Sequence, residues 1–388
     1  MKDIKYYFNK SDKINNDYFI PKIIMILKKL KIINLANNII IKLNCIIIFV
    51  IINFFFYLLN NKYKYYKDIN LNINKLQKKL ELSIFFNNIY SNLYYAAKLG
   101  KTLKPIISMK YKNKSFPIKK KKDTCLCTIG KNENLYAKEY VEYYTLLGFD
   151  KIIIFDNNNI DGENFHDVLK DYISKNLVEI IDIRGFSSSQ IGASNYCYYK
   201  YNYKCDWLGF FDMDEYLYIK LHLNINTYLY NSRFQKCQSI IFNWYIYDDN
   251  NLEKYDNRTL IERFKNIKSK EKTSKSIVRG SLNNLLIPSV HILAINVNYF
   301  CDSNGNRIFP KSFLNFDYKN NNIAYIKHFY TKTAEEFCHK IIRGDAQFKN
   351  NTFYYRIKKF FSINNITKEK IKIIEKCSKV NLNKLLKK

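Results

Sequence analysis

A chain of 388 residues that is 47% hydrophobic and 16% aromatic is long and apolar enough to fold around a sizeable core. This composition excludes an intrinsically disordered protein. The net charge of +30 would suit nucleic acid, but Lys outnumbers Arg 56 to 8, and Arg is the residue that reads phosphates and bases in a bidentate manner. We therefore expect no nucleic-acid partner.

Most of the excess charge lies in residues 1–122, which carry 25 Lys and 5 acidic residues. A negatively charged membrane surface is the partner that such a segment favours. Residues 39–59 are the most hydrophobic stretch and are about as long as a spanning helix, which needs ~20 residues, although Lys42 and two Asn residues interrupt it. We predict a membrane-associated protein, spanning the membrane once at 39–59, with a stalk up to 122. The alternative is a cytoplasmic protein in which this helix packs on the folded domain that follows.

Nine cysteines are scattered along the chain without a CxxC pair or a regular spacing. Such spacing does not indicate a disulfide framework. Cys125 and Cys127 fall in an apolar run, where a free cysteine acts as a small hydrophobic residue. The sequence therefore predicts reduced thiols and a reducing compartment.

From residue 123 onward, apolar runs of strand length alternate with amphipathic stretches of helical length. We expect strands at 124–129, 151–155, 177–183, 207–211 and 239–247, and helices at 135–147, 165–174 and 190–203, the first of them ended by Gly148. This alternation predicts an α/β domain at 123–346 with an open, mostly parallel sheet flanked by helices. Residues 347–388 are expected to form a C-terminal helical tail.

Acidic residues follow three of the predicted strands. Glu133, Asp156 and Asp212 each lie at or just beyond a strand's carboxyl end, which is where open α/β sheets bind their ligands. A carboxylate at Asp156 can accept hydrogen bonds from a nucleoside, although its Asn/Asp/Gly-rich surroundings also suit a simple Asx turn. The convergence of the three acids predicts a site at this edge.

The densest acidic motif is Asp212-Met-Asp214-Glu215. In an extended chain Asp212 and Asp214 would point to the same side, and two such carboxylates repel unless a proton or a cation lies between them. Mg²⁺ and Mn²⁺ are the cations that suit these ligands. The alternative is a strand that ends in a solvated acidic turn. Glu215 would face the opposite side and support the site instead of binding metal.

Further polar residues downstream could complete such a site. Asp248 and Asp249 follow the strand at 239–247 and could supply a general base, although a solvated turn is the more common explanation of such an Asp-Asp pair. His291 and His328 end apolar runs, where a neutral imidazole could join a metal shell or have a purely structural role. The region of Lys275 and Arg279 could add donors to phosphates.

Several of these motifs, in this order, resemble glycosyltransferase family 92 and the related family 2-like glycosyltransferases. The resemblance covers about residues 123–346 and rests on Cys127-Thr-Ile-Gly-Lys-Asn-Glu133, Gly148 to Asp156 with Asp161-Gly162, Gln190, Asp206 to Leu217, Asn243-Trp244, Asp249-Asn250, Ile261-Glu-Arg-Phe264, Lys275-Ser-Ile-Val278, Val290-His291 and His328-Phe-Tyr-Thr-Lys332. It implies a GT-A fold, a nucleotide-sugar donor such as a UDP-sugar, a divalent metal (Mn²⁺ or Mg²⁺) and inversion at the anomeric carbon.

The resemblance also implies roles for single residues. Donor binding falls to Thr128, Glu133, Asp156 and Asp212, metal binding to Asp212, Asp214 and His291, and the general base to Asp249 or Asp248, with Glu215, Trp244, His328 and Lys332 as further site candidates. The chain departs from the family pattern at Asn159-Ile160 and at Asp248, and the second departure leaves the base open.

Two functions follow as hypotheses. The first is a metal-dependent inverting glycosyltransferase, a hexosyltransferase-like enzyme that acts on a glycan, polysaccharide or lipid-linked acceptor. The second is a basic, membrane-associated binding protein whose GT-A domain is catalytically inactive.

Overall fold

The computed structural model describes residues 78–79, 81–86, 120, 122–186, 189–220, 224–282, 285–287, 289, 291, 297–309, 323–343, 352–378 and 382. The chain divides into two compact units, residues 1–91 and residues 92–388. In the first unit the described residues, 78–79 and 81–86, are helical. The predicted membrane span at 39–59 lies outside the described residues. Within the described ranges, no helix has the length and apolar character needed to cross a membrane.

The first half of the second unit is a parallel sheet with crossover helices. Its strands are β1 (Asp123–Gly130), β2 (Lys151–Asp156), β3 (Val178–Asp182) and β4 (Cys205–Phe210), which lie in the order β3-β2-β1-β4. The helices α5 (Asn134–Leu147), α6 (Phe165–Ser174) and α7 (Gln190–Tyr201) connect them. All three neighbouring pairs are parallel, so the carboxyl ends of these strands share one edge. The alternation predicted from sequence is confirmed here.

The second half makes the sheet mixed, so it is less parallel than predicted. β7 (Ile267–Arg279) runs antiparallel to β4 and to β6 (Ser239–Tyr247), while β10 (Ala324–His328) is parallel to β6 and antiparallel to β5 (Glu215–Ile219). Two short strands, β8 (Phe300–Cys301) and β9 (Arg307–Ile308), extend from β6. The remaining short elements are α8 (Ile225–Leu229), the 3-10 turn η3 (Ser232–Phe234) and α9 (Leu260–Arg263).

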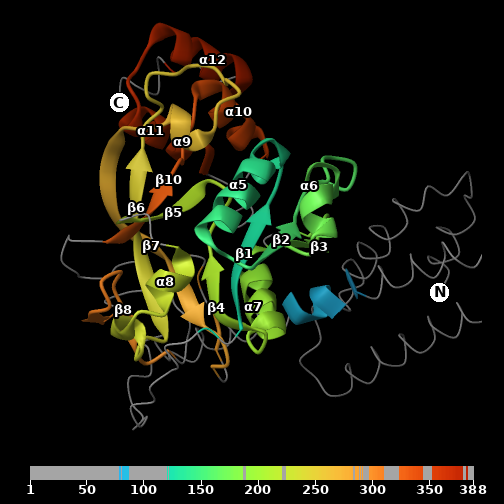
Figure 1. The fold of residues 1–388 in the computed structure, drawn as a ribbon. Coiled ribbons are helices and arrows are strands. Elements are labelled where there is room, and N and C mark those ends of the chain that lie inside the picture. Colours follow the sequence, from blue (N-terminus) through green and yellow to red (C-terminus); the bar gives the residue numbers. More distant parts are fainter. Residues whose placement is uncertain are drawn as a thin grey trace, which may run out of the picture. The chain divides into compact units, whose positions relative to one another are not determined.

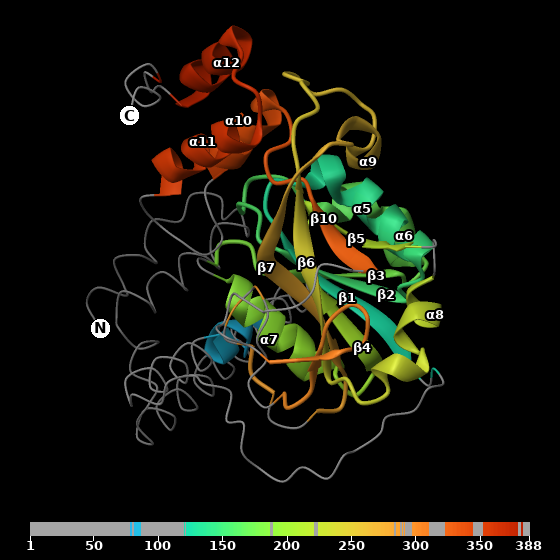
Figure 2. The same ribbon diagram turned by 90° about the vertical axis from the view of Figure 1, so that its left-hand side faces the viewer.

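Helices cover both faces of the sheet. Figure 2 shows α7 on one side of it, with α5 and α6 on the other. The core beneath α5 is aromatic: Tyr140 and Tyr144 pack on Tyr216 and Phe211, with ring centroids 4.7–6.2 Å apart. Gly148 ends α5 at φ 100°, in the left-handed region that glycine favours. The sheet edge at the carboxyl ends of the parallel strands is thus supported by a tightly packed aromatic layer.

The C-terminal helices pack together within the same unit. The helices are α10 (Ala334–Arg343), α11 (Thr352–Ile363) and α12 (Lys368–Ser378), and they bury a core of their own that includes Phe337, Phe360 and Ile374. They gather beyond the carboxyl end of β6 (Figure 1). Arg263 of α9 and Glu336 of α10 form a buried ion pair of 2.8 Å, which joins this cluster to the motif at Ile261 to Phe264. The helices therefore complete one edge of the domain.

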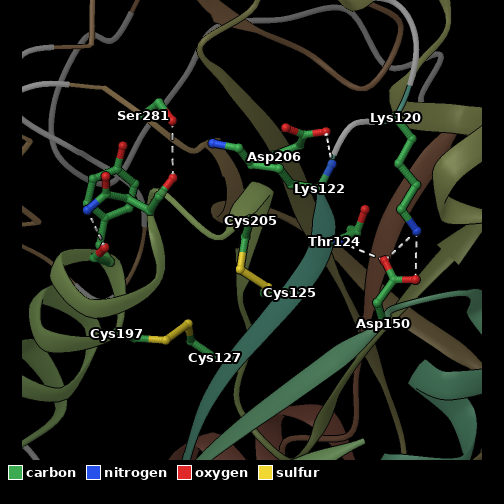
Figure 3. The surroundings of a disulfide bond; sticks show 12 residues. Lys120, Lys122, Thr124, Cys125, Cys127, Asp150, Cys197, Cys205, Asp206 and Ser281 are labelled. Carbon is green, nitrogen blue, oxygen red and sulfur yellow. Dashed lines mark hydrogen bonds and ion pairs between the residues drawn. A yellow bond between two sulfur atoms is a disulfide. The ribbon is translucent and has the colours of Figure 1, made fainter.

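Four disulfides correct the prediction of reduced thiols. Cys125–Cys205 joins β1 to β4, and Cys127–Cys197 joins β1 to α7 (Figure 3). The other two are Cys237–Cys301 and Cys338–Cys377. The partners lie 39–80 residues apart in the chain, and the fold alone brings them together. Linear spacing therefore gave no signal of them.

Candidate functional site

A pocket lies beside the carboxyl ends of β1 and β4, next to α7. Its empty space of about 300 Å³ includes a part that is open to solvent. Its lining comes from β1, β2, α7, the end of β4 and β7, and consists of Cys127, Thr128, Ile129, Phe155, Gln190, Ala193, Ser194, Phe210, Phe211, Asp212 and Lys275. Two residues predicted to bind a donor, Thr128 and Asp212, therefore line one pocket.

The acidic motif forms a turn and not the extended segment that was predicted. β4 ends at Phe210, the amide of Glu215 donates to the carbonyl of Asp212 at 3.0 Å, and β5 begins at Glu215. The carboxylates of Asp212 and Asp214 consequently have different partners. A turn forms here because the chain must pass from β4 directly to β5, which lies at the far edge of the sheet.

Asp212 is held on both of its carboxylate oxygens. The side-chain amide of Gln190 donates to Oδ1 at 2.8 Å, and Lys275 Nζ lies 2.7 Å from Oδ2. Lys275 also lies 3.3 Å from Glu215, and its side chain is 2% exposed. Burial alone would lower the pKa of Lys275, but Asp212 and Glu215 together raise it. Lys275 thus remains charged and neutralises this half of the motif.

Glu215 stabilises the turn through a hydrogen bond to its backbone. It is fully buried, and its Oε2 accepts a hydrogen bond from the backbone amide of Asp212 at 2.8 Å. Burial raises the pKa of Glu215 well above its usual range, although the neighbouring Lys275 opposes the shift. The carboxylate faces the backbone and Lys275.

Asp214 is almost fully buried and faces α10 and β10. Lys340 Nζ lies 2.6 Å from its Oδ2, and His328 Nε2 lies 3.7 Å from its Oδ1. Burial would raise the pKa of Asp214, but Lys340, followed by His328, holds it well below its usual range. Burial lowers the pKa of His328, which favours a neutral imidazole. Asp214 is therefore an ionised carboxylate beside a neutral ring nitrogen.

Met213, between the two acids, is a core residue with 1% exposure. It lies against Gly130, the last residue of β1: a Cβ at position 130 would come within 2.9 Å of Met213 Sδ and 2.4 Å of Phe165 Cζ. A side chain at position 130 would therefore require the side chains of Phe165 and Met213 to shift.

Glu133 and Lys332 lie in the same neighbourhood. Arg343 of α10 pairs with Glu133 at 2.9 Å and also donates to the carbonyl of Lys131. Lys332 has a left-handed backbone (φ 54°), is 5% exposed, and has its ammonium 4.0 Å from the centre of the Tyr136 ring. Burial lowers the pKa of Lys332, while Asp214 and Glu133 oppose that shift. The segment from Lys332 to Arg343 thus directs basic side chains at the acids that follow β1 and β4.

Asp156 ends β2 in a closed local network. Its carboxylate accepts from the amide of Asn158 at 3.0 Å and from that of Phe165 at 3.5 Å, and it is 1% exposed. Burial raises its pKa. These contacts are those of the Asx turn that the sequence left open, and they position the carboxylate at the edge shared by β1 and β2.

Trp244 lies between the two predicted histidines. Its ring is 4.3 Å from that of His328 and 5.1 Å from that of His291. Both imidazole rings thus lie against Trp244, and His328 also contacts Asp214 of the acidic motif.

Asp248 and Asp249 lie after β6, at the C-terminal helices. Asp249 is 1% exposed and pairs with the fully buried Lys370 of α12 at 2.6 Å, and its amide donates to Asn364 at 2.8 Å. Asp248 is half-buried and accepts from the amide of Asn250. The described contacts do not connect either carboxylate with the acidic turn.

Sequence reasoning missed Lys340 and Arg343. Both lie on α10, more than 100 residues beyond the acids that they contact, and a basic residue near a helix end is usual in any sequence. Lys275, which was expected near phosphates, lines the pocket and pairs with Asp212, while Arg279 donates to the carbonyls of Cys237 and Phe234. The pattern of charged residues along the sequence did not predict these ion pairs.

The residues present fit a divalent cation that takes most of its ligands from a bound molecule. Within the described ranges, no group of three or more His, Cys, Asp and Glu side chains could hold a metal. Asp214 and His328 nevertheless offer an oxygen and a nitrogen side by side, a donor set that Mn²⁺ accepts. Asp212 and Asp214 both already have protein partners, Gln190 and Lys275 for Asp212 and Lys340 for Asp214.

The fold and the site define an α/β domain with a pocket and an acidic turn at the carboxyl ends of its parallel strands. The model of glycosyltransferase family 92 matches residues 120–377, and the chain belongs to this family. A family 92 protein of Arabidopsis thaliana is 28% identical over 123 residues, which are 30% of this chain and 21% of that protein. One from Ricinus communis is 29% identical over 102 residues, 26% of this chain and 17% of that protein. The matches thus span about a fifth of each plant protein.

Solved structures give a weaker likeness. S. aureus TarS 1-349 in complex with UDP-GlcNAc has a TM-score of 0.32 at 11% identity and covers 68% of this chain and 81% of its own. The mannosyltransferase PcManGT from Pyrobaculum calidifontis, in complex with GDP-Man and Mn²⁺, has a TM-score of 0.24 at 8% identity. The match covers 42% of this chain and 46% of that protein. Scores this low carry no functional argument.

Proposed function

We propose that this chain is a glycosyltransferase of the GT-A type that moves a sugar from a nucleotide-sugar donor, a UDP-sugar, to the hydroxyl group of a glycan, polysaccharide or lipid-linked acceptor. The observation that carries the proposal is the joint position of Thr128 and Asp212 in one pocket of a family 92 domain. Membership of the family supports the reaction class, and the pocket supports a place for the donor.

In this proposal each part of the donor has a place at the shared strand edge. Asp156, after β2, is assigned to the nucleoside, and Thr128 and Asp212 to the donor within the pocket. Asp214 and His328 are the residues that would hold a divalent cation, Mn²⁺ or Mg²⁺. When bound, the cation would neutralise charge on the leaving diphosphate.

The proposed chemistry is an inverting transfer. A carboxylate takes the proton of the acceptor hydroxyl, the acceptor oxygen forms a bond to the anomeric carbon, and the bond from that carbon to the diphosphate oxygen breaks on the opposite face. Asp248 and Asp249 are the carboxylates that the family resemblance offers as the base. Asp248 is the better candidate, because Asp249 is neutralised by Lys370.

The test is donor binding and turnover by the purified full chain. UDP binding is measured by calorimetry, and UDP release is measured from a panel of UDP-sugars with Mn²⁺. We expect both signals in the wild type and a loss of UDP release in the Asp212→Asn/Asp214→Asn variant. Asp171→Asn, on the exposed face of α6, is the matched control and should keep both.

The same test can reject the proposal. Absence of nucleotide binding and of UDP release with every donor would contradict it. If the wild type instead binds lipid vesicles or a polyanion equally well with and without the double substitution, the inactive binding protein is the better description.

A further inference from the structure

The contact between Lys340 and Asp214 occupies the oxygen that faces α10. Lys340 Nζ lies 2.6 Å from Asp214 Oδ2 and 2.8 Å from the carbonyl of Tyr330, and it is 4.2 Å from the centre of the Tyr330 ring. A cation that bound Asp214 and His328 would come close to this ammonium group. The lysine and a divalent ion therefore compete for one carboxylate.

The site has no surplus of negative charge to offer a metal. Four carboxylates meet four basic side chains: Glu133, Asp212, Asp214 and Glu215 against Lys275, Lys332, Lys340 and Arg343. All eight side chains are at least two thirds buried, so water screens them little. Burial also raises the pKa of Glu215, so the negative charge does not exceed the positive charge, and a divalent ion that entered alone would add positive charge to this cluster.

A diphosphate changes this balance, because it brings negative charge on both phosphates. Lys340 is the basic residue that pairs with Asp214, whereas the similarly exposed Arg343 pairs with Glu133. Its side chain is 14% exposed and pairs with one carboxylate, whereas Lys275 is 2% exposed and pairs with two. A long, flexible ammonium group can exchange one oxygen partner for another over a short distance.

We propose that Lys340 is a positioning residue that holds Asp214 in the empty site and moves to the donor diphosphate when the donor binds, so that a divalent cation enters only together with the nucleotide. The inference rests on the proposed function, since it needs a nucleotide site beside Asp214. It assigns to Lys340 a role in the order of binding and in donor affinity.

The experiment measures metal and nucleotide binding separately, on the full chain. Free Mn²⁺ is followed by electron paramagnetic resonance with and without UDP, and UDP binding is measured by calorimetry with EDTA. The wild type should bind Mn²⁺ at least about tenfold more tightly with UDP than without it. Lys340→Met should bind Mn²⁺ alone about tenfold more tightly than the wild type and bind UDP in EDTA about tenfold more weakly.

Two further variants act as controls. Lys340→Arg keeps the charge and should restore UDP binding in EDTA. Lys358→Met removes one charge from an exposed position of α11 and should leave both affinities unchanged. Thermal unfolding of each variant shows whether it is folded. If Lys340→Met does not fold, the Mn²⁺ affinity of the wild type with and without UDP still tests the proposal.

The possible outcomes distinguish failure of the proposed role of Lys340 from failure of the proposed function. Equal Mn²⁺ affinity of the wild type with and without UDP would overturn the role of Lys340, as would a Lys340→Met variant with wild-type affinities. Binding of UDP without any Mn²⁺ binding would also overturn it while leaving the nucleotide site in place. Failure of the wild type to bind UDP under every condition would instead reject the proposed function, and this inference with it.

Discussion

Lys370 of α12 and Asp249, two residues beyond β6, form an ion pair of 2.6 Å in which neither side chain is more than 2% exposed. Removal of one partner from such a pair leaves a buried, uncompensated charge, which costs about 3–5 kcal/mol. The pair also joins the C-terminal helices to the sheet. We therefore assign Asp249 a role that is primarily structural.

Single and double substitutions test this assignment. Lys370→Met and Asp249→Asn should each lower the free energy of unfolding by about 3 kcal/mol, and the double variant should lose less than the sum of the two. Urea denaturation measures all three, with the exposed Lys372→Met as control. If Asp249→Asn instead keeps its stability and loses UDP release, Asp249 is the catalytic base, and Asp248→Asn should then retain activity.

Lys275 is predicted to stabilise the domain as well as the pocket. Its replacement by Met would leave the fully buried Glu215 and the neighbouring Asp212 without their shared cation. We expect a loss of about 3 kcal/mol in the free energy of unfolding. Lys272→Met, exposed on the same strand, should change it by less than about 0.5 kcal/mol. A stable Lys275→Met variant would contradict the buried network.

The four disulfides are predicted to form in the native protein. Peptide mapping of unreduced, alkylated protein from an oxidising host should identify Cys125–Cys205, Cys127–Cys197, Cys237–Cys301 and Cys338–Cys377. A cross-link over 39–80 residues stabilises by about 4 kcal/mol in the chain-entropy model. Reduction should therefore lower the melting temperature, and protein made in a reducing cytosol should be less stable. Full alkylation without a reductant would contradict the pairing.

The raised pKa of Glu139 on α5 leads us to predict that the stability of the domain depends on pH. Burial raises the pKa of Glu139 to about 7, although it accepts a hydrogen bond from the amide of Leu260. Because the folded pKa exceeds the unfolded one, the stabilisation is present in full below about pH 4.5 and is lost as the pH rises through 7.

A neutral replacement removes this dependence. Glu139→Gln should match the wild type at pH 5 and exceed its free energy of unfolding by about 1–2 kcal/mol at pH 8, a range that allows for partial exposure. Glu142→Gln, exposed on the same helix, should show no such change with pH. Urea denaturation at the two pH values measures the difference, and a constant difference for Glu139→Gln would exclude the ionisation of Glu139 as its cause.

The parallel half of the fold could be predicted from sequence because its signals are local. The strand at 239–247 and the helix at 165–174 have the predicted bounds, since apolar runs and helical periodicity coincide with burial there. β7 was missed because its first half, from Ile267, is a run of exposed Lys, Ser and Glu that pairs along an antiparallel edge. Tertiary pairing, not residue pattern, makes that segment a strand.

The candidate site was predictable only in part, for a similar reason. The acids lie at or just beyond strand ends and Thr128 lies near the end of β1, so their place at one edge follows from topology. Their partners do not: Lys340 and Arg343 reach the acids from α10, and Lys370 reaches Asp249 from α12. Contacts between elements more than 100 residues apart leave no mark in local patterning.

The contact between Gly130 and Met213 has a consequence for engineering of the site. The middle residue of the acidic motif is buried and, together with Phe165, fills the space that a missing side chain leaves at the end of β1. In a variant library aimed at a new donor preference, a larger residue at position 130 would therefore require its neighbours to repack. Positions 130 and 213 should be kept or exchanged as a pair, with diversity placed on the pocket wall contributed by α7.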